Sequence, residues 1–539
     1  MMRTTEFMAA FSLAGIVAVV PSYATGQEFS RVPGRTLPQA YYQRVYEKPD
    51  LFELQHGWIQ SAQRAEAMNT AVSGTLPLVV IPALFADSED PHISHEQMQA
   101  VLFDGPSDYG TLNEFYEEVS SGRLSVVGQV APWTRTSLTM SEVVAGSYGL
   151  GDGARTGEYL IEALDSADAI IDFGLFDNDG PDGSPNSGDD DGRVDAVAFQ
   201  FLEIAASCGG PSIWPHRSRI DGWTSDGSPY TTNDSQPDGQ PILVSDYIVQ
   251  GATDCGGVEA QTATTIAHEL GHVLGITDLY DRSRGVEPEH RHWVVGCWSL
   301  MAAGAWGCGA SDREEWVRPT HMGAWEKIQL GWLSELEEAP PALLHQYTLD
   351  PVLSSQQALK IPLESGDQAD TNEYLLVEYR VKDGFDQDLP ASGVLVYHVD
   401  PTKTHNQLLW SEPQWYMVSL LEADGNSSLQ RSFQEGGNRG EAGDAWGVAG
   451  TGRISNSTIP STRLNSGDES PVTIHDISIV GGEAHITVST AVVADASLVH
   501  AFLGSNVTPL TTEEEEYLDA YGNNNGQYDV GDLRAYLRR

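Results

Sequence analysis

The chain has 539 residues, enough for roughly two to four domains, and 40% of them are hydrophobic. The formal net charge is −48 and only five residues are lysines, so the chain lacks the basic surface that nucleic-acid binding requires. Acidity of this degree fits calcium binding and solubility in salty water, and it carries no information about the fold.

The first 24 residues are predicted to be a secretory signal peptide. Arg3 precedes an apolar run from Phe7 to Val20, and Ser22 and Ala24 resemble the small residues of a signal-peptidase site. The run is too short to span a membrane comfortably and the sequence offers no other candidate span. We therefore expect a secreted, extracellular protein without stable membrane insertion.

Residues 25–73 contain helical-looking segments ahead of the first strong strand pattern. They are predicted to be a short helical pro-segment, and an ordinary N-terminal subdomain is the alternative.

Residues 74–338 are predicted to form an α+β catalytic domain, because strand-like and helix-like segments alternate there. A further helix is expected over 318–333, where Thr320 could cap it and Gly331 could end it. The other expected elements are buried strands at 76–85, 124–130 and 193–201, and helices at 111–120 and 159–169.

Acidic residues are dense between positions 172 and 195. Calcium loops are built from alternating oxygen ligands around a glycine turn, and residues 181–188 resemble an insertion in such a loop. A solvated acidic loop is the alternative. The predicted calcium ligands are Asp177, Asp179, Asp191 and Asp195.

The stretch from Thr265 to Asp278 reads H-E-x-x-H-x-x-G-x-x-D. Residues four apart share one face of a helix, so His268 and His272 can bind one metal ion, and two imidazoles suit zinc. Gly275 permits a sharp turn that can return Asp278 as an oxygen ligand. Three protein ligands and one water are typical of a catalytic zinc site. The alternative is an amphipathic helix with core or surface histidines.

Glu269 is the predicted catalytic residue. Zinc lowers the pKa of a bound water to about 7, and Glu269 can take its proton so that hydroxide attacks a scissile carbonyl. A second electrophile is expected among Tyr280, His290 and His292; alternatively, Tyr280 packs under the site and both histidines are solvated. Further on, Met301 follows a serine and precedes small residues, which is typical of a methionine turn beneath a zinc site. Core filling is the alternative for Met301.

The four cysteines predict two disulfides, because an even number is expected in an exported protein. Three pairings exist. We favour Cys208 with Cys255 and Cys297 with Cys308, since each pair brackets a loop near the predicted site. A cysteine-rich zinc site is the alternative, but no C-x-x-C spacing occurs.

Two further regions follow the catalytic domain. Short strands separated by turns predict an all-β, sandwich-like domain over 339–492. Residues 505–539 predict a separate calcium half-hand, a single loop of the EF-hand type. Tyr521 stands where such a loop has its first Asp, and Asp519 could substitute for that Asp. The predicted calcium ligands are Asn523, Asn525, Asp529 and Asp532.

With these motifs in view, the chain resembles the immune inhibitor A family of secreted zinc metalloproteases from roughly residue 40 to 490. The resemblance implies a zincin fold, protein or peptide substrates, a pro-segment that makes the protein a zymogen, and structural calcium. The stretches that carry it are 76–133, 213–217, 268–281, 298–304, 325–332, 378–380 and 422–425.

Carried over by position, the resemblance implies His268, His272 and Asp278 as zinc ligands and Glu269 as the catalytic residue. Related zinc proteases use a later glutamate as third ligand, which here would be Glu287 or Glu289. The C-terminal half-hand resembles a dockerin repeat. A true dockerin usually has two, so a cohesin-type partner would require that one repeat suffices.

Two kinds of function compete. The first is a secreted zinc-dependent endopeptidase. The second is a catalytically inactive, calcium-dependent binding protein on a protease scaffold, and the intact Glu269 argues against it because a binding scaffold has no need of that carboxylate. A zinc hydrolase acting on something other than protein is a third possibility, which the helix motif does not separate from the first.

Overall fold

The computed structural model describes most of the chain from residue 58 onward. The predicted site residues Glu287, Glu289 and His290 lie outside the described residues, as do positions 1–57. The described ranges are 58–68, 70–151, 153–281, 292–308, 318–363, 372–406, 416–448, 452–503 and 509–538.

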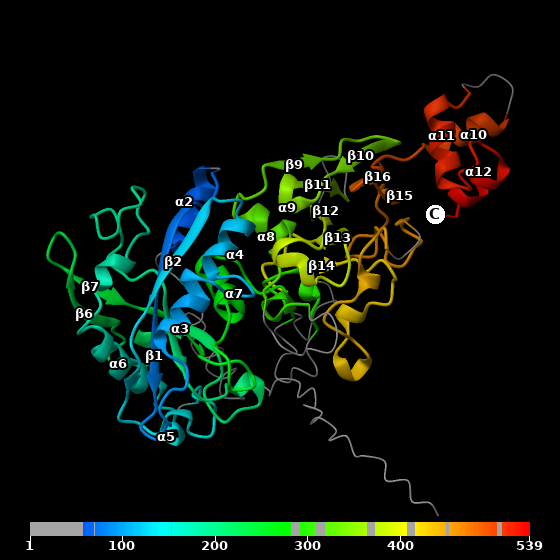
Figure 1. Ribbon diagram of the computed structural model, residues 1–539. Helices are drawn as coiled ribbons and strands as arrows, with labels where there is room; N and C mark the ends of the chain where they lie inside the picture. Colours follow the sequence, from blue (N-terminus) through cyan, green and yellow to red (C-terminus); the bar gives the residue numbers. More distant parts are fainter. Residues whose placement is uncertain are drawn as a thin grey trace, which may run out of the picture. The chain divides into compact units, whose positions relative to one another are not determined.

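A six-stranded, mostly parallel sheet supports the first half of the chain (Figure 1). Its path is β2-β1-β4-β8-β5, with β3 also paired to β1 and only β5 antiparallel. The central strand β1 is buried on both faces, which explains its continuous apolar sequence. The bounds are β1 Gly74–Leu84, β2 Leu124–Val130, β3 Thr134–Arg135, β4 Val197–Phe201, β5 His216–Arg219 and β8 Asp246–Gly251.

Helices cover both faces of this sheet. Alternate residues of β1 enter different hydrophobic clusters: Leu78 packs with helices α4 (Leu112–Val119) and α7 (Thr264–Val273), whereas Val79 packs with helix α6 (Thr156–Ala167). The mixture of helices and sheets agrees with the predicted α+β class. Smaller elements are α3 His95–Gln99, η2 Ala100–Asp104, α5 Met140–Val144, η3 Phe173–Phe176, η4 Ala206–Cys208, η5 Ile220–Gly222, β6 Tyr230–Ser235 and β7 Pro241–Val244.

The helix expected over 318–333 is much shorter in the structure. Helix α8 spans Ala324–Gln329 and its N-cap is Gly323, so the prediction that Thr320 caps it is wrong. The Thr320 hydroxyl instead donates to the carbonyl of Cys297 at 2.8 Å. Gly331 adopts a φ of 68° shortly after the helix, as a helix-ending glycine does.

Two sheets follow, and they share a hydrophobic core. The five-stranded sheet has the order β14-β13-β12-β11-β9 and the three-stranded sheet the order β10-β16-β15. Leu359 and Val377 of the first pack in one cluster with Ile474 and Ile486 of the second, an arrangement compatible with the predicted sandwich. The bounds are β9 Glu335–Glu338, β10 His345–Leu349, β11 Gln357–Pro362, β12 Tyr374–Arg380, β13 Gly393–Val399, β14 Val418–Leu420, β15 Thr473–Val480 and β16 Glu483–Ser489.

The five-stranded sheet also contributes to the core of the first half. Leu376, Leu395 and Tyr397 belong to the same hydrophobic cluster as Leu270 and Met301. The predicted domain boundary at 338 therefore separates regions that bury side chains against each other. The remaining short helices of this region are η7 Gly296–Trp298, η8 Ala303–Trp306, α9 Val352–Ser355, η9 Gly384–Asp388, η10 Ser428–Gln430, η11 Phe433–Glu435 and η12 Ala442–Asp444.

Both ends of the described chain are helical. Helix α2 (Trp58–Met68) belongs to the predicted pro-segment, and Trp58 is buried. The C-terminal segment contains α10 (Asp495–Leu503), α11 (Thr512–Tyr521) and α12 (Val530–Tyr536) around a small cluster of their own. Within the described ranges, every helix is too short or too polar to cross a membrane.

Candidate metal centre

Helix α7 presents its two histidines to one carboxylate. The Nε2 atoms of His268 and His272 lie 3.2 and 3.3 Å from the same Oδ1 of Asp278. The two rings stand nearly perpendicular, with centroids 4.9 Å apart. All three side chains are buried, and one ligand atom from each lies within 4.8 Å of the others. The structure thus brings together the three residues that the sequence motif predicts as metal ligands.

Backbone carbonyls fix the orientation of both imidazole rings. Nδ1 of His268 lies 3.0 Å from the carbonyl of Leu300, and Nδ1 of His272 lies 2.7 Å from that of Ile276. A carbonyl only accepts, so this network assigns the ring proton to Nδ1. The Nε2 lone pairs then face the Asp278 oxygen. Three converging acceptors need a cation, and two imidazole nitrogens with one carboxylate oxygen suit zinc.

The turn after α7 brings Asp278 back to the histidines. Gly275 has a φ of 89°, and its N–H donates to the carbonyl of His272 at 2.9 Å. The N–H of Ile276 donates to the carbonyl of Gly271 at 3.0 Å. These two bonds form a Schellman motif, which requires a left-handed residue at the position of Gly275. The glycine in the sequence motif therefore performs the predicted turn.

The charges near the two histidines differ. Burial lowers the pKa of His268, but the hydrogen bond with Asp278 and the charges of Glu269 and Asp278 outweigh it and raise the pKa. Burial lowers the pKa of His272, and the charge of Arg217 lowers it further. Both rings would have to be neutral to bind a metal.

Met301 lies directly beneath the metal-binding face of α7. It is fully buried, and a Cβ added to Gly271 would lie 2.4 Å from its Sδ. Its carbonyl accepts the N–H of Leu279 at 2.8 Å, next to Asp278. Because the preceding carbonyl is the one that orients His268, this short segment supports two of the three candidate ligands. This proximity is what a methionine turn predicts and core filling alone does not.

We expect Gly271→Ala to destabilise the protein, because its methyl group would overlap Met301 in a full core. Overpacking of this kind costs about 1–3 kcal/mol, and the roughly 1 kcal/mol by which alanine favours a helix over glycine offsets part of it. Thermal unfolding measures the effect. Gly153→Ala is the matched control, since its added Cβ would meet only Ala145 at 3.9 Å. Equal melting temperatures for the two variants would contradict the packing described here.

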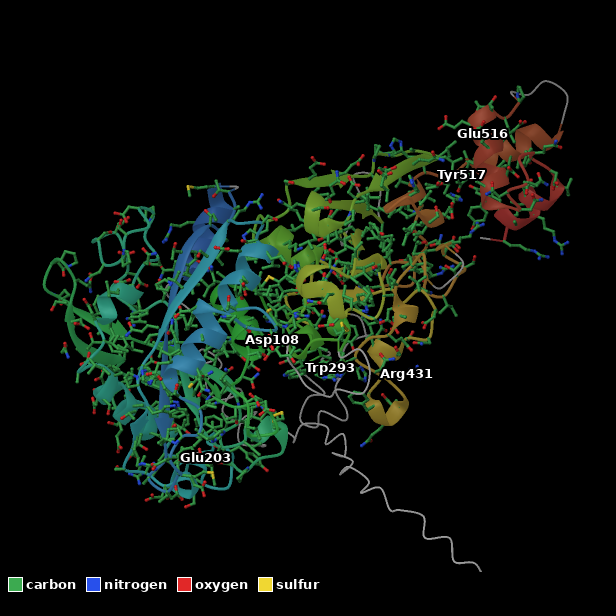
Figure 2. All side chains as sticks on the ribbon, in the orientation of Figure 1. Asp108, Glu203, Trp293, Arg431, Glu516 and Tyr517 are labelled. Atoms are coloured by element: carbon green, nitrogen blue, oxygen red, sulfur yellow. A yellow bond between two sulfur atoms is a disulfide. The ribbon has the colours of Figure 1, made fainter. Side chains whose placement is uncertain are left out.

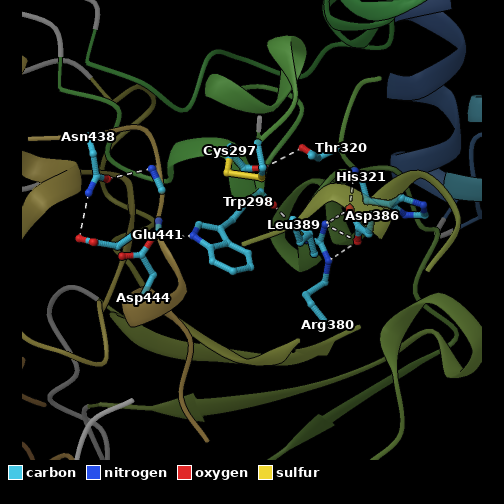
Figure 3. The surroundings of a disulfide bond; sticks show 12 residues. Cys297, Trp298, Thr320, His321, Arg380, Asp386, Leu389, Asn438, Glu441 and Asp444 are labelled. Carbon is cyan, nitrogen blue, oxygen red and sulfur yellow. Dashed lines mark hydrogen bonds and ion pairs between the residues drawn. A yellow bond between two sulfur atoms is a disulfide. The ribbon is translucent and has the colours of Figure 1, made fainter. Parts of the chain in front are cut away.

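A buried ion network holds the segment before Met301 from the other side. The Arg380 guanidinium bonds Asp386 at 2.6 and 2.7 Å and donates to the carbonyl of Trp298 at 3.0 Å (Figure 3). Burial alone would raise the pKa of Asp386, but Arg380 and then His321 overcome it and lower the pKa. Strand β12 thereby anchors the methionine turn, a connection that the sequence does not reveal.

Two of the three candidate electrophiles are described. The Tyr280 ring packs edge-on against Trp293, labelled in Figure 2, at 5.9 Å between centroids, as expected for a tyrosine under the site. His292 is buried, and its Nδ1 lies 3.0 Å from the Tyr416 hydroxyl. The alternative that His292 is solvated is therefore wrong. Glu269 is half-buried, next to the buried His268 in the sequence.

Three of the four predicted calcium ligands in the acidic loop form a buried cluster. One oxygen each from Asp177, Asp179 and Asp195 lies within 4.8 Å of the others. Asp191 lies outside this cluster and accepts the N–H of Arg193 at 2.9 Å. Oδ1 of Asp177 and Oδ1 of Asp195 have no hydrogen-bond partner among the described residues. A cluster of buried carboxylates with oxygens that lack hydrogen-bond partners fits a cation.

Helix α2 closes over this acidic cluster. Trp58 Nε1 donates to Asp195 Oδ2 at 3.0 Å, and Arg64 donates to the carbonyl of Asp179. A described part of the predicted pro-segment is thus packed onto the predicted calcium loop.

The C-terminal half-hand forms a hydrogen-bonded loop between α11 and α12. Asp519 accepts the N–H groups of Asn525 and Gly526, both at 2.9 Å, and Asp532 accepts those of Asn523 and Asp529 at 2.9 and 2.7 Å. Asp519 therefore occupies the part of the loop that the first ligand would need. Calcium binding by Asn523, Asn525, Asp529 and Asp532, and the dockerin resemblance, stay predictions.

The two disulfides are Cys208–Cys255 and Cys297–Cys308. The favoured pairing is confirmed, and the alternative of a cysteine-rich zinc site is wrong. The second disulfide joins residues on either side of Met301 and helps to fix the same segment.

Comparison with known proteins connects this centre to a peptidase family. Residues 91–333 match the family model described as immune inhibitor A peptidase M6, catalytic domain. The chain is 27% identical to the pre-pro-metalloprotease PrtV of Vibrio cholerae serotype O1 over 237 residues, which are 42% of this chain and 24% of that protein. It is 28% identical to immune inhibitor A of Bacillus thuringiensis subsp. alesti over 259 residues, covering 42% of this chain and 34% of that protein. The chain thus spans about a quarter to a third of the length of these curated relatives.

Proposed function

We propose that this chain, whose residues 91–333 are an immune inhibitor A peptidase M6 catalytic domain, is a zinc-dependent endopeptidase. The observation that carries the proposal is the convergence of His268, His272 and Asp278 on one point. Zinc bound there supplies Lewis-acid activation of water and of the scissile carbonyl. Peptides and proteins are the substrates.

The roles of the residues follow from their surroundings. His268 and His272 bind through Nε2, because their Nδ1 atoms are held by backbone carbonyls, and Asp278 adds an oxygen ligand. Glu269 takes a proton from the attacking water and delivers it to the leaving amine. Among the described residues, no hydrogen bond engages the Glu269 carboxylate, which leaves it free for this exchange.

The direct test is casein cleavage by the purified protein. We expect a chelator to remove activity and added zinc to restore it, with zinc found by metal analysis. Zinc-bound protein that cleaves no peptide would favour the binding-protein alternative. Protein purified without zinc that still cleaves casein would refute the proposal.

We also propose that Asp177, Asp179 and Asp195 bind calcium. Burial first, and then the negative charges of the neighbouring aspartates, raise the pKa of Asp177 to about 8. The same causes raise the pKa of Asp195 well above its ordinary value, although Trp58 and the N–H of Asn178 oppose them. Three buried carboxylates would repel one another without a cation, and oxygen ligands are what calcium prefers.

This calcium site predicts a specific dependence of stability on pH. A carboxyl whose pKa is raised by folding stabilises the protein fully below its unfolded pKa of about 3.9, and the contribution is lost as pH rises through the folded value. Without calcium, we expect the melting temperature to fall between about pH 4 and pH 8, the range set by the ordinary Asp value and Asp177. Saturating calcium should abolish the fall.

The matched variant is Asp177→Asn, which removes the carboxyl whose pKa is raised to about 8. It should weaken both the pH-dependent fall and the response to calcium. Melting curves recorded with a calcium-selective chelator and with calcium decide the matter. Identical pH profiles in the two conditions would speak against this site.

We further propose that the protein is a secreted zymogen. The predicted signal peptide at 1–24 and the two disulfides support export. The relative PrtV is named a pre-pro-metalloprotease. Helix α2, which belongs to the predicted pro-segment, packs on the acidic loop. N-terminal sequencing of the mature, active protein tests the proposal.

A further inference from the structure

A second acidic cluster lies far from the first, where two segments of the chain pair. The N–H of Ala423 donates to the carbonyl of Asp444, and the N–H of Asp424 donates to that of Gly443, both at 3.0 Å. A Cβ added to Gly443 would lie 2.2 Å from Oδ2 of Asp424, so this carboxylate sits against bare backbone. The pairing brings acidic residues from both segments to one place.

Three carboxylates converge there. One oxygen each from Asp424, Glu441 and Asp444 lies within 4.8 Å of the others. Asp424 is exposed, Glu441 is half-buried and Asp444 is fully buried. The cluster therefore extends from the surface to the interior.

Asp444 provides an independent indication of a ligand. Its Oδ2 accepts Trp298 Nε1 and the N–H of Glu441, both at 2.8 Å (Figure 3). Its Oδ1 is also buried, yet it has no hydrogen-bond partner within the described ranges. Burial, and then the charges of Glu422 and Glu441, raise the pKa of Asp444 to about 7. A buried carboxylate oxygen without a donor is costly, and a cation would satisfy it.

Amide side chains complete the surroundings. Asn426 and Asn438 each donate to Oε1 of Glu441 at 2.9 Å, and Asn426 also donates to Oδ2 of Asp424 at 2.9 Å. Neutral donors hold these two carboxylates in position without cancelling their charge. The two carboxylates therefore add negative charge close to Asp444, which has one buried oxygen without a donor.

We propose that Asp424, Glu441 and Asp444 bind a calcium ion, a site additional to the acidic loop at 177–195. The donors are all oxygen, which favours a hard cation over zinc. Calcium accepts six to eight irregular oxygen ligands, including water, whereas magnesium demands a near-ideal octahedron. A site with one exposed ligand and one buried ligand suits calcium.

The location gives the ion a role beyond the proposed peptide hydrolysis itself. Loop 422–444 holds the segment that leads to Met301. The Arg439 carbonyl accepts the N–H of Cys297 at 2.6 Å, and the Leu429 carbonyl accepts the N–H of Val294 at 2.9 Å. Trp298 bonds the cluster directly. An ion at this point would fix loop 422–444 and, through it, the methionine turn whose carbonyl orients His268.

The test counts calcium ions in the full-length protein by equilibrium dialysis. We expect Asp424→Asn and Glu441→Gln each to bind one calcium ion fewer than the wild type, or to bind that ion at least about tenfold more weakly. Asp226→Asn is the matched control: Asp226 is an exposed aspartate that accepts a backbone N–H two residues on, at 3.2 Å, and it belongs to none of the acidic clusters that the described residues form. Calcium content does not depend on peptidase activity, so this result and that of the casein assay are separable.

Terbium provides a second readout. Tryptophan-sensitised terbium emission should decrease in Asp424→Asn, because Trp298 bonds a ligand of the site, and should remain in Asp226→Asn. Circular dichroism checks that each variant is folded. If Asp424→Asn does not fold, Glu441→Gln serves as the test variant in its place. Wild-type calcium content and terbium emission in a folded variant would overturn the proposal.

Discussion

Glu269→Gln is expected to reduce peptide hydrolysis by roughly 10²–10⁴-fold while leaving zinc bound. Glutamine keeps the shape of the side chain but cannot take up a proton at neutral pH. Because His268, His272 and Asp278 are untouched, the metal ligands stay in place. The measurement is kcat/KM on casein together with zinc content on the same preparation.

Glu259→Gln is the matched control for this change. Glu259 is an exposed glutamate shortly before helix α7 and has no part in the centre, so its replacement should leave hydrolysis unchanged. Undiminished cleavage by Glu269→Gln, in protein free of contaminating protease, would exclude the proposed general base. Loss of zinc in that variant would instead point to a structural role for the carboxylate.

The convergence of His268, His272 and Asp278 could be predicted because it depends on residues that are close together in the sequence. Four-residue spacing places His268 and His272 on one helix face whatever surrounds the helix. Gly275 and Asp278 lie three and six residues after His272, and the hydrogen bonds of the turn at Gly275 join residues no more than five positions apart. The disulfide pairing was accessible for a related reason, since few partners exist.

The groups that orient the two histidines, and the contacts that hold the methionine turn, could not be predicted in this way. The groups that orient the histidines are carbonyls of Leu300 and Ile276, and every residue has a carbonyl. Trp298 and Asp444 are 146 positions apart, so no sequence window contains both. Thr320 shows the opposite failure: a good capping residue donates to Cys297 instead, because tertiary packing outweighs local preference.

The acidic loop shows the same difference between local and long-range information. The alternation of Asp177 and Asp179 around a glycine is a local signal, and both join the cluster. Asp191 fits the same alternation but accepts a backbone N–H. Only the path of the chain after the inserted residues decides which later carboxylate, Asp191 or Asp195, returns to the cluster.

Asp278→Asn is expected to weaken zinc binding by more than the roughly 10–100-fold that losing a hydrogen-bond partner of a metal ligand costs. The change removes the negative oxygen that faces both Nε2 atoms while preserving the shape of the side chain. Glu287→Gln and Glu289→Gln, at the positions where related enzymes suggest a third ligand, should keep zinc. Competition with a chromophoric chelator measures all three affinities.

The alternative to Asp278 as a zinc ligand is that its carboxylate only accepts hydrogen bonds from the two histidines. An oxygen 3.2–3.3 Å from two Nε2 atoms could also accept hydrogen bonds from protonated histidines. In that case Asp278→Asn would retain zinc, whereas Glu287→Gln or Glu289→Gln would lose it. The carbonyls of Leu300 and Ile276 argue for the first outcome, because with Nδ1 already donating, an Nε2 proton would leave each buried ring charged. Two such charges 4.9 Å apart would repel each other, and one carboxylate would have to balance both.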